Sequence, residues 1–317
     1  NAVLAETAKL HEGDDENIAL WQKFLPHCRE DIQRIYDRLD INFDHELGES
    51  FYHDRLAGVV EQLEAAGLAQ QSAGATCVFL DGFETPMIVR KSDGAFLYAT
   101  TDLATIQYRM ETWQPDVILY VVDHRQGEHF QKLFATVKLL GISEADLRHI
   151  SFGTVLGDDG KPFKTRAGDT VGLEGLLDDA VAKAHAVVCE VDDEKPGGPQ
   201  LSENERKSVA WTIGHSAIKY ADLSQNRESD YVFSFDKMVA LRGNTATYMQ
   251  YAHARVNSIF AKGGVDVTAV RASDVPISID EPAERNLALR ILRFAETVAA
   301  VMDDYRPNLI TNYVYEV

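Results

Sequence analysis

The stretch DVILYVVD at 116–123 determines the predicted fold, because it is a nearly continuous apolar run that ends in a polar loop. Such a run is typical of a strand buried on both faces of a parallel sheet. The helix predicted after it has one apolar face, made of Phe130, Leu133, Phe134, Val137 and Leu140, and can end at Gly141. A further strand, ISFGTVLG at 150–157, completes a β-α-β crossover. The sequence therefore predicts an open α/β sheet whose ligands bind at the carboxyl ends of the strands.

The flanking regions differ in periodicity. Upstream, helical spacing predicts an amphipathic covering helix over 16–39 and a second helix that Asp54 can cap and Gly67 can end. Short β-branched and aromatic runs then predict strands at 77–82, 86–90 and 96–100. Downstream of Gly157 the pattern is helical, with candidates around 203–220, 246–260 and 283–303, no notable strand alternation, and a Pro-Gly loop at 193–200.

Composition limits the class of protein. The apolar fraction of 45% and the charged fraction of 26% are those of a folded globular protein. No apolar run approaches the roughly 18 residues that a membrane span needs, and the first residues lack a leader pattern, so we expect a cytoplasmic protein and no membrane partner. The net charge is −19, of which residues 1–200 carry −17. This balance argues against non-specific nucleic-acid binding, although local basic patches stay possible. The three cysteines, Cys28, Cys77 and Cys189, form no CxxC pair, and we expect buried or partly buried thiols.

A basic segment follows the last predicted strand. Lys161, Lys164 and Thr165 lie in the loop GDDGKPFKTRAGDT, where two ammonium groups and a hydroxyl could close over a triphosphate. The alternative is a solvated basic loop, because a short KxxKT pattern discriminates poorly. No GxxxxGK[ST] occurs, which excludes a P-loop.

Tyr98 and Asp102 straddle a predicted strand-to-helix junction and are four residues apart. At the carboxyl edge of a sheet, a carboxylate beside a phenol ring suits a guanidinium, through paired hydrogen bonds and cation–π attraction. The alternative is that Asp102 caps the helix predicted from Leu103 and that Tyr98 is a core ring. Gln126 follows the central strand and faces the same crevice by topology.

Two other site chemistries lack support. His124 and His129 are five residues apart without a carboxylate in HExxH register, so we expect no metal ion held by side chains. No GxSxG elbow and no Cys-His motif is present, so no covalent intermediate is predicted.

Five long blocks together resemble arginyl-tRNA synthetases. They are KSDGAFLYATTDLATIQYR (91–109), VILYVVDHRQGEHFQKLF (117–134), FGTVLGDDGKPFKTRAGDTVGLEGLLDDA (152–180), IKYADLSQNRESDYVFSFDKM (218–238) and GNTATYMQYAHARVNSIF (243–260). The resemblance spans nearly the whole chain in family order. It implies a Rossmann-like α/β class I synthetase catalytic domain with a partial parallel sheet, followed by an all-α anticodon-binding domain.

The resemblance also implies residue roles. Tyr98, Asp102 and Gln126 match the positions that hold the arginine side chain. Lys161 and Lys164 match the two lysines of the family's divergent KMSKS loop, which with Thr165 would bind ATP. Three side chains in the last block, Tyr248, Tyr251 and Arg255, are candidates for tRNA contact. Aromatic residues at helical spacing are, however, more often part of a core.

The differences from the family pattern indicate how much of a family member this chain is expected to contain. No HIGH-type motif precedes the strands, and Gly214-His215 follows the KMSKS-like loop in a predicted helix, so it does not count as one. We expect a fragment that also lacks the end of the anticodon domain. The expected division is a catalytic domain at 1–173, with a helical connective segment at 1–75 and the KMSKS-like loop at 158–170, and then a helical stem-contact and anticodon-binding region at 174–317.

The function implied is that of an arginine-tRNA ligase, which activates arginine with ATP and Mg²⁺ and transfers it to the 3′ end of its tRNA. The expected partners are arginine, ATP and the arginine-specific tRNA, and the expected state is a monomer. We expect this chain alone to be inactive. The alternative is a non-catalytic tRNA-binding or interaction module derived from a synthetase, which the missing HIGH motif favours and the KMSKS-like loop and arginine pocket oppose.

Overall fold

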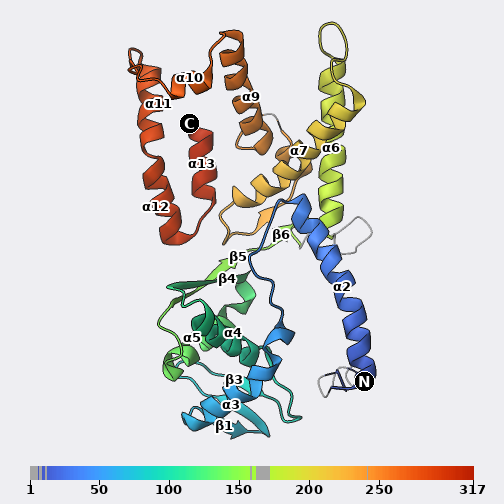
Figure 1. The fold of residues 1–317 in the computed structure, drawn as a ribbon, viewed down its shortest axis with the longest axis vertical. Helices are drawn as coiled ribbons and strands as arrows, with labels where there is room; N and C mark the ends of the chain where they lie inside the picture. Colours follow the sequence, from blue (N-terminus) through green and yellow to red (C-terminus); the bar gives the residue numbers. More distant parts are fainter. Residues whose placement is uncertain (1–5, 7–8, 11–12, 158, 162–171, 241) are drawn as a thin grey trace. The chain divides into compact units, whose positions relative to one another are not determined.

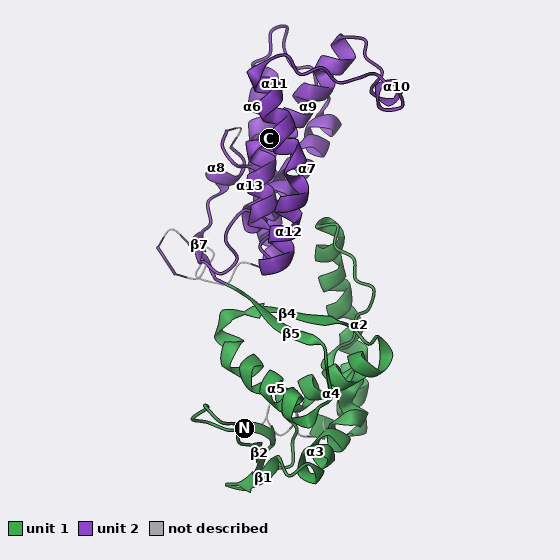
Figure 2. Ribbon diagram, turned by 90° about the vertical axis from the view of Figure 1, so that its left-hand side faces the viewer, with its two compact units in different colours: residues 1–152 green, residues 153–317 purple. Residues whose placement is uncertain are grey.

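The computed structural model describes residues 6, 9–10, 13–157, 159–161, 172–240 and 242–317. The chain divides into two compact units, residues 1–152 and residues 153–317, drawn in green and purple in Figure 2. Figure 1 labels their helices and strands. Among the described residues, no helix combines the length and apolar character needed to cross a membrane.

Helix α2 (Asp15–Arg38) is capped at its N-terminus by Asp14, whose side chain accepts a hydrogen bond from the backbone N–H of Asn17. The helix confirms the prediction over 16–39, but its role as a cover is wrong for the described residues. None of its residues is buried, and Leu20, Trp21 and Phe24 are 45%, 37% and 56% exposed. Helical periodicity therefore predicted the helix correctly, but it did not show whether another element packs against the apolar stripe of the helix.

A small α+β layer follows. A 3-10 helix, η1 (Glu49–Arg55), leads directly into α3 (Leu56–Ala65), so Asp54 lies inside η1 and does not cap the helix as predicted. The antiparallel strands β1 (Ala69–Ser72), β2 (Ala75–Val78) and β3 (Met87–Arg90) come next, in the spatial order β1-β2-β3. The buried stripe of α3, made of Leu56, Val59, Val60 and Leu63, belongs to the same core as Val78 and Val89.

Helix α4 (Tyr98–Thr112) begins where a strand was predicted. Only Phe96 pairs with a strand residue, Arg90, through an isolated bridge. In the first turn of the helix the Thr100 hydroxyl donates a hydrogen bond of 2.5 Å to the carbonyl oxygen of Val89, which ties this turn to β3. The prediction of a strand over 96–100 was therefore wrong, since this long-range bond overrides local β propensity.

The β-α-β crossover is confirmed. Strands β4 (Val117–Asp123) and β5 (Asp146–Phe152) pair in parallel, and α5 (Gly127–Leu140) connects them. Figures 1 and 2 show α4 and α5 on the same side of these strands. On this side Tyr120 is buried against Phe130, with ring centroids 4.9 Å apart.

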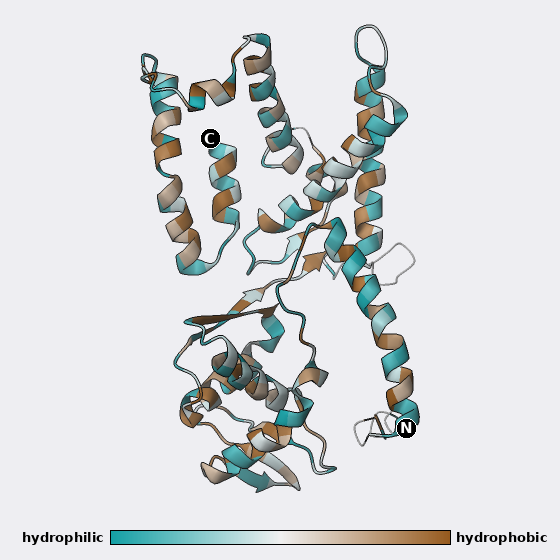
Figure 3. Cartoon of the chain, in the orientation of Figure 1, coloured by the Kyte–Doolittle hydropathy of each residue, from teal (hydrophilic) through white to brown (hydrophobic). Residues whose placement is uncertain are grey.

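The other face of β4 differs from prediction. Figure 3 shows that β4 is mainly hydrophobic. Yet Val117, Leu119 and Val121 are 42%, 39% and 66% exposed within the described part of the chain. The expectation that both faces of β4 are buried was wrong for this face. An apolar run shows that a strand can be buried, but it does not show which element packs against it. The predicted strand at 150–157 is also two strands, since β5 ends at Phe152.

The second unit begins at Gly153, where the backbone leaves β5. A Cβ at this glycine would lie 2.6 Å from the backbone carbon of Ser229, so only glycine allows this close approach. The short strand β6 (Val155–Leu156) then pairs in parallel with β7 (Tyr231–Val232), a strand that the sequence did not predict.

The rest of the second unit is helical, as predicted. Its helices are α6 (Leu173–Asp193), α7 (Glu203–Leu223), α8 (Phe235–Met238), α9 (Ala246–Lys262), α10 (Val267–Arg271), α11 (Pro282–Leu292), α12 (Phe294–Asp304) and α13 (Asn308–Glu316). The predicted loop at 193–200 joins α6 to α7, and Ser202 with Glu205 forms a capping box at the start of α7.

Asp192 connects the ends of α6 and α7. Its side chain is 2% exposed and accepts hydrogen bonds from the Arg206 guanidinium at 2.8 and 3.0 Å, the Lys195 ammonium at 2.9 Å, and the backbone N–H groups of Gln200 and Leu201 at 3.1 Å each. Burial by itself raises the pKa of this carboxyl, but these bonds together hold the pKa well below its ordinary value of 3.8.

We expect Asp192→Asn to lower the melting temperature of the second unit by several degrees at pH 7, since an amide leaves buried cationic donors without their charged acceptor. Because the folded-state pKa of Asp192 is depressed, its stabilisation is present above about pH 4 and is lost as the pH falls further. The stability of the wild-type chain should therefore fall more between pH 7 and pH 3 than that of Asp192→Asn, as measured by urea unfolding. An equal fall in both would contradict the assignment.

Candidate functional site

Three side chains meet at the carboxyl end of β4. Asp102 Oδ2 lies 2.7 Å from His129 Nε2, and the side chains of these residues are 29% and 15% exposed. The Tyr98 ring approaches the His129 imidazole edge-on, with centroids 5.0 Å apart. Tyr98 itself is 60% exposed. The cluster therefore combines a fixed carboxylate with an open aromatic face.

Two helices position this cluster. Tyr98 and Asp102 are four residues apart on α4 and so share one of its faces. The opposite face is anchored in the core through Leu103 and Ile106, both 0% exposed. His129 is the third residue of α5, and its neighbour Phe130 is 4% exposed. Asp102 therefore lies inside α4, where the helix begins after Leu97, and the alternative that it caps a helix from Leu103 is wrong.

Gln126 lies beside the cluster in sequence. It is the last residue of η2 (His124–Gln126) and the residue before α5. Its side chain is exposed and makes no hydrogen bond to any described residue. The structure therefore brings Tyr98 and Asp102 together through His129, and places Gln126 three residues before His129 without a hydrogen bond to any of the three.

The loop after β4 is organised by Asp123. Its carboxylate accepts hydrogen bonds of 2.8 Å from the backbone N–H and from the guanidinium of Arg125. The bonds from Arg125 hold the pKa of Asp123 well below its ordinary value. Asp123 is therefore committed to shaping the turn that leads into α5.

Tyr120 forms the floor below the two helices. Its ring packs on Phe130 and Phe134, and the Arg109 guanidinium carbon lies 5.3 Å from the ring centroid. Burial raises the pKa of the phenol. Its hydroxyl is buried and makes no hydrogen bond to any described residue. The floor is therefore made mainly of aromatic rings, with the Tyr120 hydroxyl and the Arg109 guanidinium as its polar groups.

The predicted ATP-binding residues belong to the second unit. Lys161 is exposed, and its backbone N–H donates a hydrogen bond of 3.1 Å to Asp159 Oδ1 while its carbonyl accepts one of 2.8 Å from Gly157. These bonds form a turn directly after β6. Lys164 and Thr165 lie outside the described residues.

The three candidate tRNA contacts lie on α9. Tyr248 is half-buried, with its ring centroid 5.9 Å from that of Tyr315 on α13. Tyr251 is 52% exposed, and Arg255 is also exposed. Tyr248 thus packs between helices, whereas Tyr251 and Arg255 are open to solvent within the described structure.

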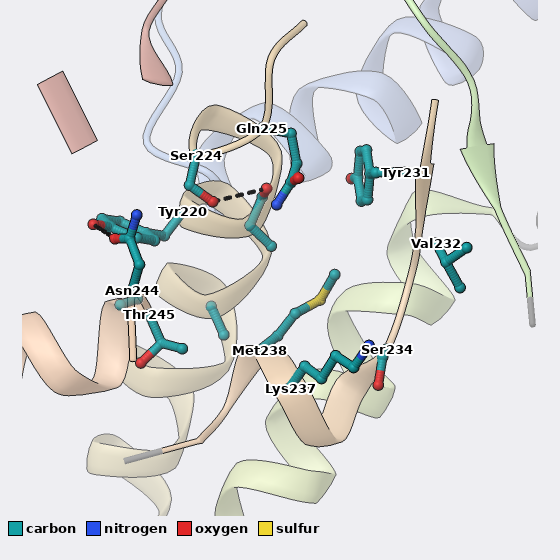
Figure 4. A pocket seen from close by; sticks show the side chains of 13 residues that line it. Tyr220, Ser224, Gln225, Tyr231, Val232, Ser234, Lys237, Met238, Asn244 and Thr245 are labelled. Atoms are coloured by element: carbon teal, nitrogen blue, oxygen red, sulfur yellow. Dashed lines mark hydrogen bonds between the residues drawn. The ribbon is translucent and has the colours of Figure 1, made fainter. Parts of the chain in front are cut away.

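The described part of the second unit includes cavities away from this cluster, of which two are well formed. One, of about 140 Å³, lies between α7, β7 and the start of α9, where Tyr220, Tyr231 and Lys237 line it (Figure 4). The Tyr220 hydroxyl is 2.5 Å from Asn244 Oδ1. The other, of about 200 Å³, has mainly apolar walls contributed by α6 and α7. Both lie outside the unit that holds Asp102.

Comparison with known protein families identifies the family to which these sequence blocks belong. Residues 4–235 match the family described as tRNA synthetases class I (R), catalytic domain. The chain belongs to this arginyl-tRNA synthetase family. Residues 249–317 match the DALR anticodon binding domain, and so confirm the predicted all-α domain after the α/β catalytic domain.

Individual relatives agree with this membership. The chain is 56% identical to an arginine–tRNA ligase of Rhodopirellula baltica over 99% of its own length and 48% of the relative's. It is 44% identical to one from a Picosynechococcus strain, over 98% of the chain and 54% of the relative. The chain therefore spans about half the length of the curated relatives it matches.

Solved structures show the same fold. The arginyl-tRNA synthetase of Plasmodium falciparum superposes with a TM-score of 0.82 at 28% identity, covering 98% of this chain and 52% of that one. The Thermus thermophilus arginyl-tRNA synthetase superposes with a TM-score of 0.72 at 21% identity, covering 96% and 58%. Both superpositions cover nearly the whole length of this chain. They therefore agree with a class I synthetase fold.

Reasoning from the sequence missed one member of the cluster. His129 was considered only as a possible metal ligand with His124, and the spacing of five residues argued against that role. The available signal for its contact with Asp102 was only that both residues lie in the first turns of helices that follow predicted strands. The structure places the preceding strands, β3 and β4, in separate sheets, so a shared sheet edge does not explain the contact.

Proposed function

We propose that the protein from which this chain is taken is an arginine-tRNA ligase, which activates arginine with ATP and transfers it to the 3′ end of its cognate tRNA. The observation that carries the proposal is the Tyr98, Asp102 and His129 cluster, which offers a carboxylate and an open aromatic face at the sheet edge. Family membership supports the same reaction.

The chemistry of recognition follows from this arrangement. Asp102 and Gln126 supply acceptors for the planar fork of a guanidinium, and the Tyr98 ring adds cation–π attraction. A lysine ammonium has the charge but cannot reproduce the forked contact, so it leaves acceptors without partners. Arginine is therefore selected by geometry as well as by charge.

The activation step needs no general base from the protein. The arginine carboxylate is already ionised at neutral pH and attacks the α-phosphorus of ATP in line, with pyrophosphate leaving. Lys161, Lys164 and Thr165 bind the phosphates, and the lysines stabilise the charge that develops on them. Mg²⁺, bound mainly through the ATP phosphates, would add to that stabilisation.

Transfer to tRNA engages the helical part of the chain. Tyr251 and Arg255, exposed on α9, are available for RNA contact, and Tyr248 supports them from within the helix packing. We assign residues 1–173, with the connective segment 1–75 and the KMSKS-like loop 158–170, to catalysis, and residues 174–317 to stem contact and anticodon binding. The protein acts as a cytoplasmic monomer in this proposal.

The test is calorimetric titration of the 317-residue chain with arginine and then with lysine, in the presence of ATP and Mg²⁺. We expect arginine to bind at least about tenfold more tightly than lysine, because of the forked contact. Equal binding of the two amino acids would contradict the arginine pocket. An absence of heat with both would favour the alternative of a non-catalytic module, to be checked by binding of the tRNA itself.

A further inference from the structure

The hydrogen bond between His129 and Asp102 joins two helices that are far apart in sequence. Asp102 lies on α4 and His129 on α5, and the two atoms are 2.7 Å apart. The imidazole also contacts two aromatic rings edge-on, with centroids 5.0 Å from that of Tyr98 and 5.2 Å from that of Phe130. His129 is therefore a fixed group, 15% exposed, against which a more exposed carboxylate rests.

The direction of this bond follows from its partner. An ionised carboxylate only accepts hydrogen bonds, so Nε2 of His129 must carry the proton and donate it to Oδ2 of Asp102. Oδ2 thus has one lone pair engaged, while Oδ1 accepts no hydrogen bond from any described residue. The carboxylate is held in one rotamer with its second oxygen open.

We propose that His129 is a positioning residue for the specificity of the site: it orients the carboxylate of Asp102 so that Oδ1 meets a guanidinium beside the Tyr98 ring. This inference rests on the proposed function. An aspartate on a helix surface otherwise samples several rotamers, and fixing one of them on binding costs affinity. His129 removes that cost before the ligand arrives.

The role predicts a loss that depends on ligand shape. A forked guanidinium needs the plane of the carboxylate in one orientation, whereas a lysine ammonium accepts a broad range of directions. Removing the anchor should therefore weaken arginine binding and leave the weak binding of lysine nearly unchanged. A residue with only a structural role would, on removal, weaken the binding of both or lower the melting temperature.

The link itself is measured first, without ligand. We expect the imidazole ¹H–¹⁵N spectrum of the chain to show His129 Nε2 as a protonated nitrogen, assigned by its loss in His129→Gln. Asp102→Ala should shift this signal and leave the His27 signal in place, because His27 lies on α2 with a side chain that is 72% exposed. An unprotonated His129 Nε2, or one that ignores Asp102→Ala, would overturn the inference.

Titration with arginine and lysine then measures the role. We expect His129→Leu to weaken arginine binding about tenfold, as removal of groups that orient a ligating side chain commonly does. His129→Gln should bind within about threefold of the wild type, since its amide can donate in place of Nε2. The matched control His27→Leu removes an exposed imidazole and should change nothing.

The outcomes separate the two proposals. Equal arginine affinity for His129→Leu and the wild type would overturn the positioning role while leaving the proposed function intact. Equal losses for leucine and glutamine, or an equal loss of lysine binding, would also overturn it. If the wild type binds no arginine although the His129 signal responds to Asp102→Ala, the proposed function fails and the specificity role falls with it.

Discussion

Asp102→Asn should weaken arginine binding by at least about 30-fold while leaving ATP binding unchanged. Asparagine keeps the size of the side chain and can still accept the hydrogen bond from His129, so the local fold should persist. What it loses is the negative charge that a guanidinium needs opposite it. The Asp102 side chain is 29% exposed, so water weakens its attraction for a guanidinium. We therefore expect an effect at the lower end of the range for charge pairs removed from solvent.

The measurement is titration of the variant with arginine and with ATP and Mg²⁺ separately. Asp116→Asn is the matched control, because this exposed aspartate lies just before β4, at the opposite end of the strand from the cluster. It should bind both ligands as the wild type does. Equal losses for arginine and ATP in Asp102→Asn would show a general disturbance and contradict the assignment of Asp102 to arginine.

Gly214→Ala should destabilise the second unit by about 2 kcal/mol, although alanine in place of glycine normally stabilises a helix interior by about 0.5–1 kcal/mol. A Cβ at this position would lie 2.7 Å from both the Cα and the nitrogen of Val181 on α6. These are backbone atoms of a long helix, which cannot turn aside as a side chain can. The two helices would have to separate, and buried residues such as Ala217 would lose contacts.

Gly58 offers a control with the opposite sign. It lies inside α3, and a Cβ there would meet nothing within 4 Å. Gly58→Ala should therefore be neutral or stabilising by up to about 1 kcal/mol. A stabilising effect of Gly214→Ala would show that α6 and α7 do not cross closely at this glycine.

Fluorescence can follow the relevant unit directly. The chain has three tryptophans, and only Trp211, on α7, lies in the second unit. In a Trp21→Phe, Trp113→Phe background, urea unfolding monitored by Trp211 reports the second unit alone. The midpoint should fall in Gly214→Ala and stay in place in Gly58→Ala.

The candidate site shows how far reasoning from residues could go. Asp102 and Tyr98 could be chosen because their chemistry suits a guanidinium and because parallel strands place their ends at one edge. Their geometry could not be predicted, since α4 begins at Tyr98, where a strand was predicted, and its first turn is hydrogen-bonded to Val89, eleven residues before Thr100. The role of His129 was hidden for the same reason, because its partner lies 27 residues away.

The sequence by itself determined the local elements and the family. Apolar runs and helical periodicity predicted β4, α5 and the long helices, since the residues that form these elements are neighbours in the chain. The five long blocks predicted the arginyl-tRNA synthetase family, and comparison confirmed it.

Only the tertiary structure decided which surfaces meet. It ended β5 at Phe152, because Gly153 passes against the backbone of Ser229, and it made Gly214 a crossing point of two helices. It also joined Asp102 to His129. Each of these features depends on a close approach between parts of the chain that are separated in sequence: a Cβ added at either glycine would lie within 3 Å of backbone atoms, and His129 and Asp102 are hydrogen-bonded at 2.7 Å. Local propensity carries no information about such distances, which packing of the whole core sets.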